Sequence, residues 1–280
     1  MRLRLRRTPR HRRNRYFEST DTRCSAISNP LGSHSRQHYG DGLIPSREAN
    51  HRLTVPAVVV SLSIVELWQM LGWPSITWVL RGGAMPRRVF LFSGHMVDRS
   101  DRPHPRFPPG KEAVAARATA GALADFGAGS SDLGLCSAAA GGDILFAETC
   151  LARGLRLEVR IPFAVTTFLI KSVTYAGNGW HDRFCAVVHH PNTRLIILPE
   201  EFGPTPVGVN PYARTNRWQL EVALGYGPEQ LVFLCLWDGQ AGDGPGGTSD
   251  MVDAVRARGG RVHILDTTTL FFTGATPWRQ

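Results

Sequence analysis

The sequence predicts an α/β protein with a single Rossmann-like domain, in which a mostly parallel sheet of about six strands carries helices on both faces. Two observations lead to this prediction. Apolar strand-like runs alternate with helix-like segments through residues 86–268, and residues 133–163 hold one complete strand, glycine-rich turn, helix and strand. Strands that alternate with helices are joined by crossovers, and crossovers make neighbouring strands parallel.

The expected strands are short apolar runs that end at Gly, Pro or polar residues. They cover residues 89–93, 133–136, 157–161, 193–198, 231–237 and 262–265. The expected helices have apolar residues at helical spacing, and Gly follows several of them. They cover residues 111–126, 167–176, 180–188, 212–224 and 248–258, with one more that begins at Asp143 and ends before Gly154. Thr248 is expected to be the N-cap of its helix.

The strongest local signal is the turn from Ser137 to Gly142, which separates a buried strand from a helix and contains only small residues. Such a turn directs backbone N–H groups and the positive end of a helix dipole toward one place, which suits a phosphate. The alternative is that the small residues merely permit a tight turn. Both interpretations are open at this point.

Ligands of open parallel sheets bind outside the carboxyl ends of the strands, and the candidate residues of this chain follow the expected strands. The candidate ligand-binding residues are Ser93, Gly94, Ser137, Gly141, Gly142, Asp143, Arg217, Asp238, Gly246, Gly247 and Thr248. His95 and Glu200 also follow expected strands. We therefore expect four of these loops to meet in one crevice.

Two segments of the chain resemble the SLOG superfamily, which joins the DNA-processing protein A domain to the Lonely Guy proteins. Residues 133–162 resemble the second strand, glycine turn and helix of that superfamily, and residues 215–265 resemble its DNA-processing branch, with Asn216-Arg217 opening a helix. The resemblance covers about residues 88–266. It implies a Rossmann-like fold that binds a nucleotide or nucleotide-derived molecule, often in a sensor or signalling role.

The chain departs from the P-G-G-x-G-T-x-x-E signature of the Lonely Guy phosphoribohydrolases. The nearest segment begins at Pro245 and reads P-G-G-T-S-D, one glycine short and without the glutamate. Glu148 and Asp253 remain as candidates for a catalytic carboxylate. We therefore expect a nucleotide sensor, with an enzyme that hydrolyses an N-glycosidic bond as the alternative. A membrane-tethered form of the same domain is a second alternative.

The basic charge of the chain lies in its first 84 residues. These hold 13 Arg, no Lys and 5 acidic residues, for a net charge of +8, whereas the remaining 196 residues hold 19 basic and 18 acidic residues, for a net charge of +1. A nucleic-acid surface is therefore not indicated for the domain. Residues 1–84 are expected to be disordered. Three interpretations of the basic run remain open: a nucleic-acid or membrane-surface arm, a targeting segment, or translated sequence upstream of a start at Met85.

The apolar stretch at 53–80 is long enough to cross a bilayer, but it contains Glu66 and two prolines, so a membrane helix is not favoured. Five cysteines without a CxxC pair indicate a reducing, cytoplasmic setting and no structural metal. Cys136 and Cys235 are expected in the core. The sequence requires no cofactor, leaves a homo-oligomer open, and predicts a C-terminal tail at 269–280.

Overall fold

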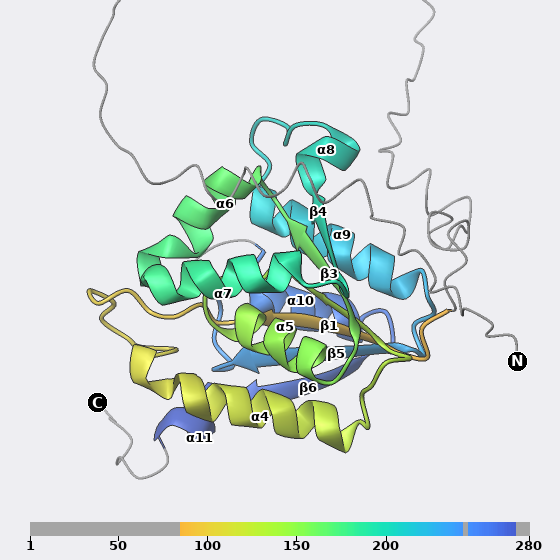
Figure 1. Cartoon of the computed structure of the whole chain (residues 1–280), viewed down its shortest axis with the longest axis horizontal. Helices are drawn as coiled ribbons and strands as arrows, with labels where there is room; N and C mark the ends of the chain where they lie inside the picture. Colours follow the sequence, from red (N-terminus) through yellow and green to blue (C-terminus); the bar gives the residue numbers. More distant parts are fainter. Residues whose placement is uncertain (1–84, 243–245, 273–280) are drawn as a thin grey trace, which may run out of the picture. The chain divides into compact units, whose positions relative to one another are not determined.

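A computed structural model describes residues 85–242 and 246–272. Its centre is a sheet of six parallel strands (Figure 1). The strands are β1 (Val89–Gly94), β2 (Leu133–Cys136), β3 (Arg156–Ile161), β4 (Thr193–Ile197), β5 (Leu231–Trp237) and β6 (Arg261–Asp266). The structure confirms the predicted α/β fold, including the number of strands and their parallel direction.

The strand order is β4-β3-β2-β1-β5-β6. The chain therefore builds the sheet outward from β1 to β4 on one side, returns to the centre, and adds β5 and β6 on the other side of β1. The register pairs Val89 of β1 with both Leu133 of β2 and Leu231 of β5. The connections that leave β1 and β5 diverge, so this pair of strands is the topological switch point of the sheet.

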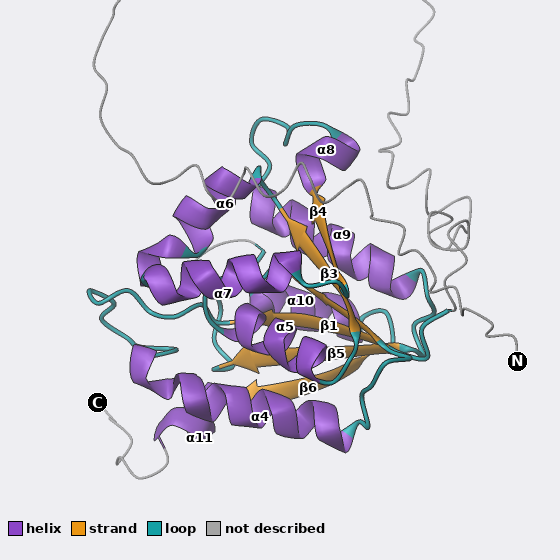
Figure 2. Cartoon of the chain, in the orientation of Figure 1, coloured by secondary structure: helices purple, strands orange, loops and turns teal. Residues whose placement is uncertain are grey.

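Helices cover both faces of the sheet (Figure 2). One face packs against α4 (Glu112–Asp125), α5 (Gly142–Ala152), α6 (Val165–Ser172) and α7 (Asn178–His189). The opposite face packs against α9 (Pro211–Leu224) and α10 (Thr248–Arg256). Because both faces are covered, the buried positions of β1, β2 and β5 are all apolar, whereas β3 buries the ion pair of Glu158 and Arg160.

Strand β1 shows this two-sided burial directly. Phe90 and Phe92 belong to the core under α4 and α5, whereas Val89 and Leu91 belong to the core under α9 and α10. The ring of Phe92 stacks on Phe146 of α5 with centroids 4.8 Å apart. The predicted core positions of Cys136 and Cys235 are confirmed, since both residues are fully buried.

Several element boundaries differ from the predicted ones. The helix expected at 167–176 is two pieces, α6 and the 3-10 turn η2 (Thr174–Ala176). A second 3-10 turn, η1 (Pro109–Lys111), precedes α4, and the expected start of α7 at Trp180 was wrong, because the helix begins at Asn178. Gly154 adopts the predicted left-handed conformation, with φ of 75°.

Two short helices were not predicted. Helix α8 (Leu198–Phe202) follows β4 directly, whereas the strand was expected to continue to residue 198; Pro199 is the second residue of this helix, and proline is well suited to the first turn. Helix α11 (Thr267–Phe272) extends the domain past residue 268, and Phe271 is buried against Phe107 with ring centroids 5.2 Å apart. The expected boundary at 268 is therefore too early.

The basic segment 1–84, the apolar stretch at 53–80 and residues 273–280 of the expected tail lie outside the described residues. Within residues 85–242 and 246–272, no helix has both the length and the apolar character needed to cross a bilayer.

Candidate functional site

The carboxyl ends of β2, β1 and β5 lie side by side at the middle of the sheet. The loops after these strands carry nearly all the predicted site residues. The expected fourth member, Glu200, is not among them: it lies in α8 after the edge strand β4, which β3 separates from β2. Three of the four expected loops therefore meet.

The turn between β2 and α5 uses its backbone N–H groups within the chain. The carboxylate of Asp143 accepts hydrogen bonds from the N–H of Ser137 at 3.1 Å and of Ala139 at 3.5 Å. The N–H of Ala140 donates to the carbonyl of Ser172, and the N–H of Gly142 donates to the carbonyl of His95. These four donors are not free for a phosphate.

The predicted glycines of this turn are explained by close packing. A Cβ atom on Gly141 would lie 2.8 Å from the carbonyl oxygen of His95, and one on Gly142 would lie 3.1 Å from the ring of Phe92. A Cβ atom on Gly94, at the end of β1, would lie 2.9 Å from the ring of Phe92. Gly141 also has φ of 127°, a conformation that favours glycine.

Asp143 lies inside the protein, with 8% of its surface exposed. Burial raises the pKa of this carboxyl to about 7, and the hydrogen bonds from the turn oppose that rise. The hydroxyl of Ser137 is also committed, because it donates to the carbonyl of Arg160 and accepts from the amide of Gln219. Both residues organise the turn.

The N-terminus of α10 is different. Gly247 stands at the N-cap position and Thr248 is the first helical residue, so the predicted capping role of Thr248 was wrong. No side chain caps this helix. In the part of the chain that the structure describes, the N–H groups of Thr248, Ser249 and Asp250 have no hydrogen-bond acceptor. Unpaired N–H groups at a helix start form an anion-binding position.

This helix start lies beside the end of β1. The hydroxyls of Ser93 and Thr248 are 3.2 Å apart, although 155 residues separate them in the sequence. Thr248 is buried and Ser93 is half-buried. The contact joins two predicted site residues at the switch point between β1 and β5.

The loop before α10 is fixed to α9. The amide of Asn216 donates to the carbonyl of Gly246 at 2.6 Å, and the N–H of Gly246 donates to the carboxylate of Asp250 at 2.7 Å. A Cβ atom on Gly246 would lie 2.5 Å from Cα of Ala213, and its φ is 86°. Glycine is thus required at 246 for both space and conformation, and it holds the open helix start in place.

A charged cluster lies on the other side of the switch point. Asp238, directly after β5, has its carboxylate 3.2 Å from Nε2 of His95 and 3.4 Å from Nε of Arg106. All three side chains are at most one-fifth exposed. Asp238 also accepts a hydrogen bond from the N–H of Gln240. Asp238 therefore lies at the carboxyl end of β5 and holds the turn that follows this strand.

The ring nitrogen Nε2 of His95 faces two groups of Asp238. It lies 3.1 Å from the backbone N–H and 3.2 Å from Oδ1 of the same residue. A neutral nitrogen accepts from the N–H, whereas a protonated one donates to the carboxylate. Burial is the main cause of a lowered pKa for His95, which favours the neutral form at pH 7.

The loop after β1 brings further basic groups to this edge. Asp98 accepts from the N–H groups of Arg106 and Phe107 and contacts the guanidinium of Arg102, which folds the loop back on itself. The guanidinium of Arg106 also donates to the carbonyl of Ala241 in the loop after β5. The arginine therefore bridges the two loops of the switch point. Its role was not foreseen, because Arg106 lies twelve residues beyond β1.

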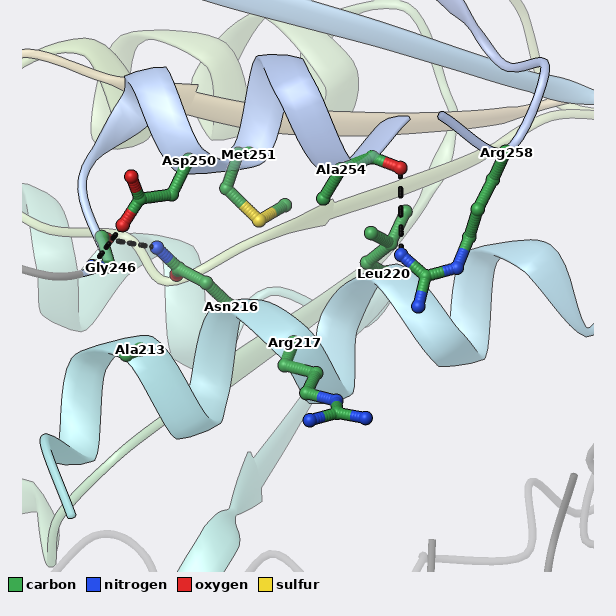
Figure 3. A pocket seen from close by; sticks show the side chains of 9 residues that line it. All are labelled: Ala213, Asn216, Arg217, Leu220, Gly246, Asp250, Met251, Ala254 and Arg258. Carbon is green, nitrogen blue, oxygen red and sulfur yellow. Dashed lines mark hydrogen bonds between the residues drawn. The ribbon is translucent and has the colours of Figure 1, made fainter. Parts of the chain in front are cut away.

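Helices α9 and α10 form a surface groove of about 440 Å³ (Figure 3). It is lined by Ala213, Asn216, Arg217, Leu220, Gly246, Asp250, Met251, Ala254 and Arg258. Figure 3 shows the side chain of Arg217 directed away from α10. Arg217 is exposed and has no hydrogen-bond or ion-pair partner within the described ranges. The structure thus places Arg217 in this outer groove, apart from Ser93.

The candidate catalytic carboxylates lie elsewhere. Glu148 binds the guanidinium of Arg183 through both oxygens at 2.7 Å, and Arg183 also binds Glu112, so the three residues link α4, α5 and α7. Asp253 lies on the exposed face of α10. Neither residue contacts the Ser93–Thr248 pair. Within residues 85–242 and 246–272, no group of three His, Cys, Asp or Glu side chains is arranged to hold a metal ion.

The sequence matches no protein-family model, and no curated protein matches it.

Proposed function

We propose that this chain binds a phosphate-bearing nucleotide or nucleotide-derived molecule at the carboxyl edge of the sheet and acts as a cytoplasmic sensor. The phosphate would face the N-terminus of α10 beside the hydroxyls of Ser93 and Thr248. The observation that carries this proposal is the uncapped start of α10, whose N–H groups have no acceptor in the described part of the chain. The 3.2 Å contact between the hydroxyls of Ser93 and Thr248 places this start at the switch point, where doubly wound sheets bind ligands.

Polar groups next to this helix start support a nucleotide ligand. Arg106 carries a positive charge on the β1 side, where it pairs with Asp238, and the Asp238 carboxylate also suits a ribose hydroxyl. The contrast with the β2–α5 turn is informative. The β2–α5 turn is also built of small residues, but Asp143 already accepts hydrogen bonds from its N–H groups.

The test is binding of AMP, ADP-ribose and NAD to the full chain by isothermal calorimetry. Thr248→Val keeps the shape of the side chain and removes its hydroxyl, so affinity should fall roughly fivefold or more. The matched control is Thr149→Val, which removes a hydroxyl bonded to a carbonyl of its own helix, at Leu145. Absence of binding by the wild type, or equal loss in both variants, contradicts the proposal.

A hydrolase is the second candidate, and one observation favours it. Asp238 and His95 form a carboxylate–imidazole pair at the switch point, which is the kind of pair that general acid–base catalysis uses. Prolonged incubation with AMP or NAD followed by chromatography would detect released base. Release by the wild type that disappears in Asp238→Asn supports the hydrolase, whereas binding without release supports the sensor.

A further inference from the structure

We infer that Tyr212 stacks on the base of the bound nucleotide and makes the site select ligands that carry an aromatic ring. This inference rests on the proposed nucleotide function. Tyr212 lies at the start of α9, next to the loop that leads into α10.

Tyr212 is exposed although it is aromatic. It is the second residue of α9, and 38% of its surface is accessible. Its hydroxyl lies 3.2 Å from the hydroxyl of Ser172, which is almost fully buried at the end of α6. The ring of Phe163 meets the Tyr212 ring edge-on, with centroids 5.4 Å apart and planes at 86°. The tyrosine ring is therefore held by its hydroxyl and by one neighbouring ring.

A ring held in this way loses little freedom when another ring stacks on it, so the cost of ordering is already met in the free protein. Aromatic platforms of this kind bind bases through their π-faces. The backbone of α9 is fixed at the same point, because the side chain of Asn210 caps it by accepting from the N–H groups of Tyr212 and Ala213.

The position of Tyr212 suits a base whose phosphate lies at α10. Ala213, the next residue, is the one that Gly246 packs against, and Gly246 lies two residues before the start of α10. The backbone carbonyl of Ser172 accepts a hydrogen bond from the N–H of Ala140 in the β2–α5 turn. The tyrosine thus lies between the turn after β2 and the loop before α10.

A positive charge lies near this platform. The ammonium group of Lys171 is 5.8 Å from the centre of the Phe163 ring. Val207 and Val209, in the loop before α9, are also exposed. Lys171 thus adds a positive charge to the aromatic pair of Phe163 and Tyr212.

The test compares three probes on the full chain: AMP, UMP and ribose 5-phosphate. In the wild type, affinity should follow the size of the stacking surface, with AMP strongest and ribose 5-phosphate weakest. Tyr212→Leu should weaken AMP binding roughly tenfold and leave ribose 5-phosphate within about twofold, because stacking acts on the base alone. Tyr212→Phe is the matched control, since it keeps the ring and loses the contact with Ser172, and it should retain the preference for AMP.

Equal affinities for AMP and ribose 5-phosphate in the wild type would overturn the inference and leave the phosphate site intact. An unchanged preference for AMP in Tyr212→Leu would do the same. If neither AMP nor ribose 5-phosphate binds, the proposed function fails and the inference fails with it. The wild-type series needs no variant, so the outcome does not depend on how Tyr212→Leu folds.

Discussion

Replacing Asp143 by Asn tests the inward-facing carboxylate of the β2–α5 turn. Burial raises the pKa of Asp143 from the ordinary value of 3.8 to about 7 in the folded protein. Between these pH values, the folded protein keeps the proton and the unfolded chain has lost it. The contribution of Asp143 to stability is therefore most favourable below pH 4 and declines as the pH rises to about 7.

The expected size of this decline follows from the shift. Each pKa unit corresponds to about 1.4 kcal/mol, so the full change is on the order of 4 kcal/mol between pH 4 and pH 8. The amide introduced by Asp143→Asn has no proton to lose in this range, and its oxygen can still accept from the N–H of Ser137. The free energy of unfolding of the wild type should thus fall relative to Asp143→Asn as the pH rises.

Urea unfolding at pH 5, 6, 7 and 8, followed by circular dichroism, measures this difference. The lowered pKa values of His95 and Asp132 also make stability depend on pH, in the opposite direction. Both residues are present in the two proteins, so their contributions cancel in the comparison. A difference that stays constant with pH, or that changes in the opposite direction, would refute the argument that burial governs this carboxyl.

Three further predictions concern packing and domain limits. Glu148→Gln should lower the free energy of unfolding by about 0.5–1 kcal/mol, because its ion pair with Arg183 is partly exposed, and it should leave AMP affinity unchanged; a large loss of affinity would instead indicate a role in binding. Phe271→Ala should cost about 3 kcal/mol in urea unfolding and Phe271→Leu clearly less, since the ring is buried; equal small losses would mean that α11 is peripheral. Residues 85–280 produced alone should show one cooperative thermal transition, and the absence of a transition would show that the domain needs residues before 85.

The regular elements were predictable because their signal is local. The run from Leu231 to Trp237 is apolar at each position, as a strand buried on two faces requires. Helices α8 and α11 gave no comparable signal. They have five and six residues, too few for a periodic pattern, and α8 begins at a leucine followed by a proline.

The site was predictable in its general location but not in its details. Ser93, Asp238 and Thr248 follow or face strand ends, and strand order brings those ends together. Which glycine turn has available N–H groups depends on distant partners. The carbonyls of His95 and Ser172 close the first turn, and no sequence spacing announces those contacts.

The β2–α5 turn carries its own hydrogen-bond acceptor. The carboxyl group of Asp143 occupies the position that a ligand carboxylate or phosphate occupies in an anion-binding turn. Because Asp143 is part of the chain, this acceptor cannot dissociate. Shortening the side chain to glycine would leave the N–H groups of Ser137 and Ala139 without their acceptor. The domain would then contain a buried receptor for a small carboxylate such as formate. If added formate restores the stability of Asp143→Gly, the wild-type Asp143 side chain provides the acceptor that this turn needs.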